Sequence, residues 1–156
     1  MKLWQKDKAS LKEVETFTVG KDPEFDLMLA PFDVLGNIAH AKMLASVGLL
    51  TNEEANQLTE ELKSIYAKIP NSKFQIPQGV EDIHSYVEFL LTEKLADVGK
   101  KIHSARSRND QVLVDLKLFL RSEIEKTVNN TKQLFDLLIS LSEQYKDDLL
   151  PGYTHL

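Results

Sequence analysis

Hydrophobic residues recur with helical spacing in four segments of this chain. The first segment, from Leu29 to Val47, has Pro31 in its first turn and Gly48 just beyond its end, where glycine commonly caps a helix. The second begins at Thr51 with a Thr-x-x-Glu capping box and runs until Pro70 stops it. The pattern predicts two helices with a turn at Gly48 between them.

Two more helices are expected further along the chain. The non-periodic stretch 71–79 predicts a loop, after which a third helix begins near Asp82 and ends at Gly99. The polar run 100–108 predicts a turn. Between Ser107 and Pro151 there is no glycine or proline, and apolar residues keep helical spacing. This predicts one long helix.

The long helix needs more partners than the preceding segments provide. A helix of roughly 35 residues measures about 50 Å, which exceeds the diameter of a small domain. Its distal part is apolar on more than one face, at Leu137, Leu138, Ile139 and Leu141. We therefore expect burial in a bundle whose other helices come from sequence after Leu156 or from other subunits, and self-association of the chain.

The predicted fold class is all-α, because no sheet-forming alternation of useful length is present. We expect a small helical amino-terminal domain at residues 1–106 and, at 107–156, the start of a bundle of long helices. We interpret the chain as a fragment of a larger protein.

Composition narrows the function. The 156 residues include no cysteine, which excludes disulfides and thiolate metal sites, and no stretch apolar enough for a signal peptide or membrane span, so we expect a cytoplasmic protein that binds no membrane. The net charge is -5, and positive and negative residues are interspersed along the chain without forming a basic face. This argues against nucleic acid as a partner. A local basic cluster could attract an anionic small molecule, although a solvated helix end is the simpler interpretation: Lys100, Lys101, Arg106 and Arg108.

The segment 103–111 gathers polar side chains at the start of the long helix, where free backbone amides favour an anion. Arg106 and Arg108 could bind a carboxylate through paired N–H groups, and Asn109 and Gln111 each offer a donor and an acceptor. A capping arrangement of Ser107 with Asp110, plus ordinary surface arginines, would explain the same residues equally well.

Three histidines differ in their surroundings. His84 follows Asp82 at a helix start, where a cap is the more ordinary explanation than a site. His40 has apolar neighbours and is assigned to packing. His155 follows a Pro-Gly turn, where proton-transfer residues are often presented. No metal-ligand spacing, glycine-rich phosphate loop or nucleophile elbow is present, so we expect no metal and no cofactor.

Taken in order, the motifs resemble argininosuccinate lyase over nearly the whole chain. They are Phe32-Asp-Val, Gly36-Asn-Ile-Ala-His40, Glu81-Asp-Ile-His84, His103-Ser-Ala-Arg-Ser-Arg-Asn-Asp-Gln111 and Pro151-Gly-Tyr-Thr-His-Leu156. The run Ser107–Gln111 is the most specific, because it separates this family from its fumarase and adenylosuccinate lyase relatives. Family members cleave argininosuccinate to arginine and fumarate by β-elimination, without a cofactor.

The resemblance implies roles for five residues. His155 becomes a proton-transfer residue, Asn109 and Thr154 substrate contacts, Arg108 a carboxylate ligand and His84 a secondary pocket residue. It also implies a small anionic substrate and a homotetramer, in which three subunits build each active site.

Three departures from the family follow. The carboxy-terminal two thirds, with the catalytic serine loop and a substrate-binding lysine, is missing, so we expect the chain alone to be inactive. Gln5-Lys6-Asp7 stands where the family has Gly-Gly-Arg-Phe. The stretch 18–25 is longer than usual and lacks a substrate-contacting serine, which suggests an N-acylated substrate.

Two other functions stay open. Another fumarate-releasing lyase on the same scaffold is one, although Ser107–Gln111 argues against it. A non-catalytic helical protein of the lens-crystallin kind is the other.

Overall fold

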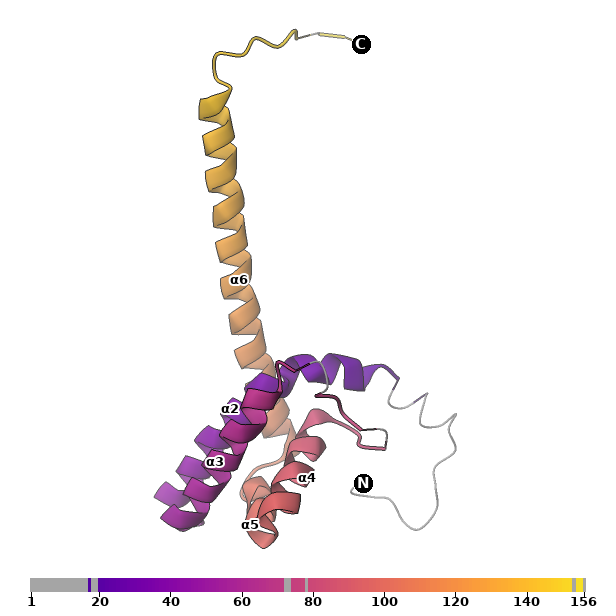
Figure 1. The fold of residues 1–156 in the computed structure, drawn as a ribbon, viewed down its shortest axis with the longest axis vertical. Helices are drawn as coiled ribbons and strands as arrows, with labels where there is room; N and C mark the ends of the chain where they lie inside the picture. The colour runs from indigo at the N-terminus through magenta and orange to yellow at the C-terminus, as the bar shows by residue number, and fades with distance from the viewer. Residues whose placement is uncertain (1–16, 18–19, 72–73, 78, 153, 156) are drawn as a thin grey trace. The chain divides into compact units, whose positions relative to one another are not determined.

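A computed structural model describes residues 17, 20–71, 74–77, 79–152 and 154–155 of the chain (Figure 1). Every regular element in these ranges is a helix, which confirms the all-α prediction. The elements are α2 (Asp22–Ser46), α3 (Asn52–Lys68), α4 (Ile83–Leu95), the short α5 (Asp97–Lys100), a 3-10 turn η1 (Lys101–His103) and α6 (Arg108–Gln144). The chain divides into two compact units, residues 1–119 and 120–156.

Helix α2 begins at Asp22, earlier than the predicted start near Leu29. Pro23 lies in the first turn, where a helix needs no N–H donor, and two acidic residues there complement the helix dipole. Pro31 therefore lies inside the helix, not in its first turn as predicted. The other end is as predicted: α2 stops at Ser46, and Gly48 has a φ of 78°.

The capping box of α3 is confirmed. The backbone N–H of Glu54 donates to Thr51 Oγ1 at 3.1 Å, and the N–H of Thr51 donates to Glu54 Oε2 at 3.0 Å. These two bonds satisfy amides that have no partner inside the helix. The helix ends at Lys68, just before Pro70.

Helix α4 starts as predicted and ends early. Asp82 is its N-cap and accepts a 2.6 Å hydrogen bond from the backbone N–H of Ser85. The helix ends at Leu95, so the prediction that Gly99 ends it is wrong. Gly99 lies inside α5, where a Cβ would stand 2.4 Å from the carbonyl oxygen of Leu91. Glycine is needed there because two backbones meet, not because a helix stops.

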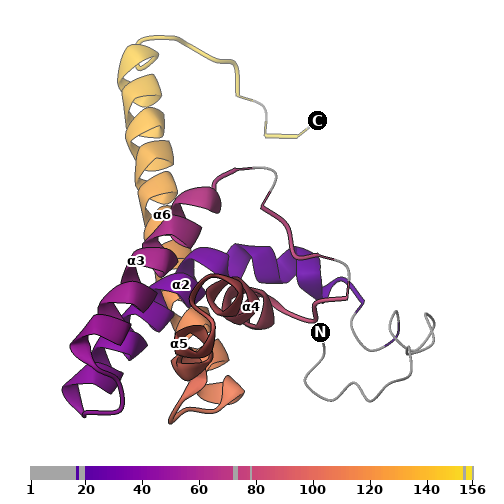
Figure 2. The same ribbon diagram turned by 60° about the horizontal axis from the view of Figure 1, so that its bottom comes forward.

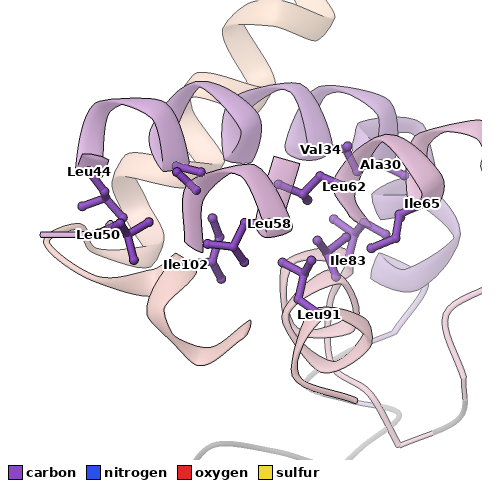
Figure 3. Packing of buried hydrophobic residues seen from close by; sticks show 13 residues of the cluster. Ala30, Val34, Leu44, Leu50, Leu58, Leu62, Ile65, Ile83, Leu91 and Ile102 are labelled. Carbon is purple, nitrogen blue, oxygen red and sulfur yellow. The ribbon is translucent and has the colours of Figure 1, made fainter. Parts of the chain in front are cut away.

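The core of the first unit lies where α2 packs against α3 and α4 (Figure 2). Figure 3 shows Leu58 and Leu62 of α3 among the side chains that fill it. The buried hydrophobic residues are Ala30, Val34, Ala41, Leu44, Leu50, Ala55, Leu58, Leu62, Ile65, Ile83, Val87, Leu91 and Ile102. This core holds α2 against α4, the helices that supply Asp33 and His84 to the polar cluster described below.

The long helix is confirmed as α6, which runs without a break and ends at Gln144, before Pro151. In the second unit several apolar side chains of α6 are exposed to solvent. The exposed fraction is 54–62% for Leu134, Phe135, Leu137, Leu138 and Ile139. In the described part of the chain, none of the helices combines the length and apolar character that crossing a membrane would require.

Candidate functional site

Three buried side chains from three helices meet in the first unit. His84, in the first turn of α4, is 3% exposed, and its Nδ1 lies 2.9 Å from Asp33 Oδ1 of α2. The same nitrogen lies 3.4 Å from Asp115 Oδ2 of α6. Since a carboxylate can only accept, Nδ1 carries the ring proton and donates it to Asp33.

Amide side chains complete the environment of Asp33. Asn37 Nδ2, one turn later on α2, donates to Asp33 Oδ2 at 2.9 Å, and Gln111 Nε2 of α6 donates to Asp33 Oδ1 at 2.5 Å. The guanidinium of Arg106 donates in turn to Asn37 Oδ1. Asp33 is fully buried, and these donors offset the cost of keeping its charge away from water.

Arg108 is joined to this cluster through the same glutamine. Its Nη1 donates to Gln111 Oε1 at 2.9 Å, while its Nη2 lies 3.5 Å from Ser85 Oγ and 3.8 Å from Glu88 Oε2. Arg108 is the first residue of α6, beside the free amides of the helix start. An unbroken chain of hydrogen bonds thus links Arg108, Gln111, Asp33 and His84.

The two acids of the cluster are not equivalent. Burial, reinforced by the negative charge of Asp33, raises the pKa of Asp115 to about 7, against the opposing influence of His84 and Arg106. Neither oxygen of Asp115 has a hydrogen-bond partner among the described residues. The Asp115 carboxyl therefore stays protonated at pH values at which aspartate side chains are normally ionised.

His84 also holds its proton more tightly than usual. Burial acts to lower its pKa, but the hydrogen bond and charge of Asp33, helped by Asp82 and Asp115, outweigh burial and raise it. The pKa of Arg106 is lowered, chiefly by its burial. The cluster therefore balances buried acids against a histidine and an arginine.

The loop before α6 is held in place at both ends. His40 Nε2 lies 2.9 Å from the carbonyl oxygen of Ser104, so this half-buried histidine ties α2 to the loop. Ala105 has a φ of 57°, a left-handed conformation that is uncommon for a residue with a Cβ. The predicted cap is present: Ser107 N–H donates to Asp110 Oδ2 at 2.8 Å, and Asp110 N–H donates to Ser107 Oγ at 3.3 Å.

Two hollows adjoin the cluster. A pocket of about 240 Å³ has His84 in its wall, with Leu29, Val112 and four acids: Asp22, Asp26, Glu81 and Asp82. A larger, mostly apolar groove of about 580 Å³ lies between α2 and the first turns of α6, with Asp115, Gln111 and Arg106 at its polar side. The acidic pocket suits a group that carries positive charge or donates hydrogen bonds.

A metal is the first alternative for such a cluster. The ligand atoms of Asp33, His84 and Asp115 lie within 4.8 Å of one another. However, both oxygens of Asp33 already accept from amide donors, and His84 Nδ1 faces Asp33 as a donor. The hydrogen bonds account for the arrangement without a cation.

The sequence-predicted residues fall in two places. His84 and Arg108 are joined by the chain of hydrogen bonds, and Asn109 follows in the first turn of α6 with an exposed side chain. Thr154 and His155 belong to the second unit, where both are exposed. The substrate roles of all five stay predictions.

The sequence reasoning missed Asp33 and Asp115 and gave Gln111 no definite partner. One signal was available: Asp33 and Asn37 interrupt the apolar face of a predicted helix, and polar residues on a buried face need partners. The substitution at 5–7 lies outside the described residues, and so does part of the 18–25 stretch, at 18–19.

Comparison with known proteins identifies the family. The model of a family described as Lyase matches residues 7–156. The chain belongs to this lyase family. Among its relatives, the argininosuccinate lyase of Parabacteroides distasonis is 60% identical over 155 residues, which cover 99% of this chain and 35% of that protein.

Other lyase relatives agree. The argininosuccinate lyase of Bacteroides thetaiotaomicron is 59% identical over 155 residues, covering 99% of this chain and 35% of the relative. That of Caldanaerobacter subterraneus subsp. tengcongensis is 46% identical over 160 residues, covering 100% and 35%. The resemblance inferred from the motifs is confirmed, and the chain spans about a third of the length of these relatives.

Proposed function

We propose that this chain is part of an argininosuccinate lyase that releases fumarate and arginine. The observation that carries the proposal is the 60% identity to a protein of that name over 99% of the chain. A polar cluster that joins His84 to Arg108 supports it, because an anionic substrate needs fixed cationic donors. Another fumarate-releasing lyase is disfavoured, because the relatives named above share one name.

The reaction divides between a base and an acid. A base removes the proton on the carbon next to a substrate carboxylate, the bond from the neighbouring carbon to the guanidino nitrogen breaks, and an acid protonates that nitrogen as arginine leaves. We assign proton transfer to His155 and substrate contacts to Asn109, Thr154 and His84. Arg108 would bind a carboxylate and stabilise the charge that develops when the proton leaves.

We also propose a homotetramer in the cytoplasm, with each active site built from several subunits. The exposed apolar residues of α6 in the second unit support assembly, because a solvated helix keeps such side chains on one face only.

A chimera tests the lyase proposal directly. This chain would replace the aligned amino-terminal segment of the Parabacteroides distasonis relative, with which it shares 60% of residues. Fumarate release from argininosuccinate, followed by absorbance, should occur in the chimera and not in the 156-residue chain alone. A chimera that folds as the parent does but releases no fumarate would refute the proposal and favour a non-catalytic role.

Arg108→Lys in that chimera tests the substrate contact. Lysine keeps the charge but loses the planar pair of donors, so kcat/KM should fall by about 10- to 100-fold, the worth of one hydrogen bond to a charged group. Arg121→Lys is the matched control, because the Arg121 side chain is 78% exposed and, among the described residues, forms its ion pair with Glu125 one turn away. Equal losses in the two variants would remove Arg108 from the site.

The substrate could carry an acyl group on its α-amino nitrogen, because the 18–25 stretch lacks the serine that the family uses. Turnover of free and N-acylated argininosuccinate by the chimera would be compared. A strong preference for the free form would exclude this refinement while leaving the lyase proposal intact.

A further inference from the structure

Asp33 is the point where the polar cluster converges. It is 0% exposed, and its two oxygens accept from His84 of α4, Gln111 of α6 and Asn37 of its own helix α2. A charge placed among the buried residues of α2 does nothing for hydrophobic packing and is costly to desolvate. Its three partners are side chains, not backbone groups, so it determines where those side chains lie.

The first consequence concerns the ring of His84. With Nδ1 donating to Asp33, Nε2 is the ring nitrogen left for the acidic pocket that His84 helps to line. Reversing the ring would place a neutral C–H against a buried carboxylate. Asp33 therefore selects both the tautomer and the orientation of His84.

The second consequence concerns Arg108, which does not touch Asp33. The amide of Gln111 donates through Nε2 to Asp33 and accepts through Oε1 from Arg108 Nη1. Gln111 is 5% exposed and both ends of its amide are bonded, so turning the amide over would break both hydrogen bonds at once. The orientation imposed by Asp33 at one end therefore fixes the acceptor that Arg108 meets at the other.

We propose that Asp33 is a positioning residue that orients two side chains to which the proposed function gives substrate contacts, His84 directly and Arg108 through Gln111. This inference rests on the proposed function, which gives His84 and Arg108 their substrate roles. Asp33 itself would not touch substrate, since it is completely buried.

Asp115 provides a matched control. It is equally buried and also faces His84 Nδ1, at 3.4 Å, but it makes no hydrogen bond to Gln111. Other charged groups that act on His84 are Asp82 at the start of α4 and Asp26 of α2, and Arg106 acts on both acids. Asp33→Asn and Asp115→Asn each replace one buried carboxyl by an amide of the same size. Above pH 7, where the Asp115 carboxyl is ionised, each also removes one negative charge, so a comparison made there separates contact from charge.

The test is nitrogen-15 NMR of the 156-residue chain. In the wild type, the neutral ring of His84 should carry its proton on Nδ1, and the Nη atoms of Arg108 should give separate signals because their rotation is restricted. Asp33→Asn should lower the pKa of His84 by about one unit or more and merge the Arg108 signals. Asp115→Asn should give a smaller pKa change and leave the Arg108 signals separate.

Equal effects of the two substitutions on both signals would overturn the proposal, because general charge and not contact would then be responsible. So would an Nε2-protonated ring in the wild type. Circular dichroism would check folding of each variant. If Asp33→Asn does not fold, Gln111→Met decides: the Arg108 signals should merge while His84 keeps its proton on Nδ1, and unchanged Arg108 signals would refute the proposal.

The NMR experiment requires no turnover. A chimera that folds but releases no fumarate would refute the proposed function. The spectra would still show whether Asp33 orients the two side chains. If the chimera is active but the Asp33→Asn spectra match those of the wild type, only the positioning role of Asp33 is refuted.

Discussion

At the scale of single residues, Asp115 and His84 make the stability of the first unit depend on pH. The pKa of Asp115 is raised to about 7, mainly by burial, and that of His84 is raised by Asp33 and other neighbouring acids. A group whose pKa is higher in the folded chain contributes stability that is complete below its unfolded pKa and is lost as pH rises through the folded pKa. Both groups therefore act in the same direction.

We predict that these two groups lower the free energy of unfolding as pH rises from about 5 to 8, since the unfolded pKa of an aspartate is about 4 and that of a histidine about 6.5. His40 and His103, whose pKa values are lowered chiefly by burial, act in the opposite direction as pH rises toward about 6.5. Asp115→Asn should flatten this dependence, because one of the two titrating groups is removed. Denaturant unfolding at a series of pH values measures it. A variant with the same slope as wild type would show that Asp115 does not titrate in this range.

Ala96 is a second residue with a distinct energetic role. It links α4 to α5 with a φ of 51° and a ψ of -123°, a region that suits glycine. Ala96→Gly should stabilise the chain by about 0.5–1 kcal/mol, because relief of backbone strain of about 1–2 kcal/mol exceeds the entropic cost of glycine. Thermal unfolding would measure the change.

Ala39→Gly is the control for this substitution. Ala39 is exposed inside α2, where glycine should cost about 0.5–1 kcal/mol. If both glycine substitutions destabilise by similar amounts, Ala96 carries no strain.

At the scale of helices, helix ends set by local contacts could be predicted from the sequence, whereas an end set by a long-range contact could not. The start of α3 was evident because Thr51 and Glu54 are near neighbours whose chemistry acts over one turn. The predicted end of α4 is wrong because Gly99 is required by its close approach to the Leu91 backbone, not by a helix end. That contact exists only once α5 has packed back on α4. Local rules locate helix ends reliably only where the cause is local.

The candidate site divides in the same way. Arg108 stood out because it lies in a dense polar run beside a helix start. The role of Asp33 could not be seen, because His84 and Gln111 lie 51 and 78 residues from it and meet it only in the folded unit. The position of Asp33 on an otherwise apolar helix face indicates that it needs polar partners but does not identify them.

Gly99 gives the sharpest prediction at this scale. Gly99→Ala would place a Cβ 2.4 Å from the Leu91 carbonyl oxygen, so α5 must move away from α4. We expect a loss of about 1–3 kcal/mol in the free energy of unfolding, as for other overpacked sites. Gly152→Ala is the control, because its added Cβ meets nothing within 4 Å. Equal effects would mean that α5 adjusts freely.

At the scale of the whole molecule, the apolar residues of α6 predict self-association. Leu138 and Phe135 are 56% and 62% exposed, and their neighbours are similar. We expect analytical ultracentrifugation at micromolar concentration to show oligomers, because contiguous exposed apolar surface of this kind marks an interface. Leu138→Glu should shift the equilibrium toward monomer, whereas Lys126→Glu, a change at an exposed polar position, should not. A monomeric wild type would contradict the prediction.

The unbroken length of α6 also sets an order of events in time. Its 37 residues are well beyond the roughly 12–15 at which an isolated helix becomes marginal, and its backbone hydrogen bonds all join close neighbours in sequence. Such a helix can form within about a microsecond. Meeting a second molecule depends on diffusion and slows as the solution is diluted. The helix should therefore be complete before any partner arrives, and dilution should delay its burial without delaying its formation.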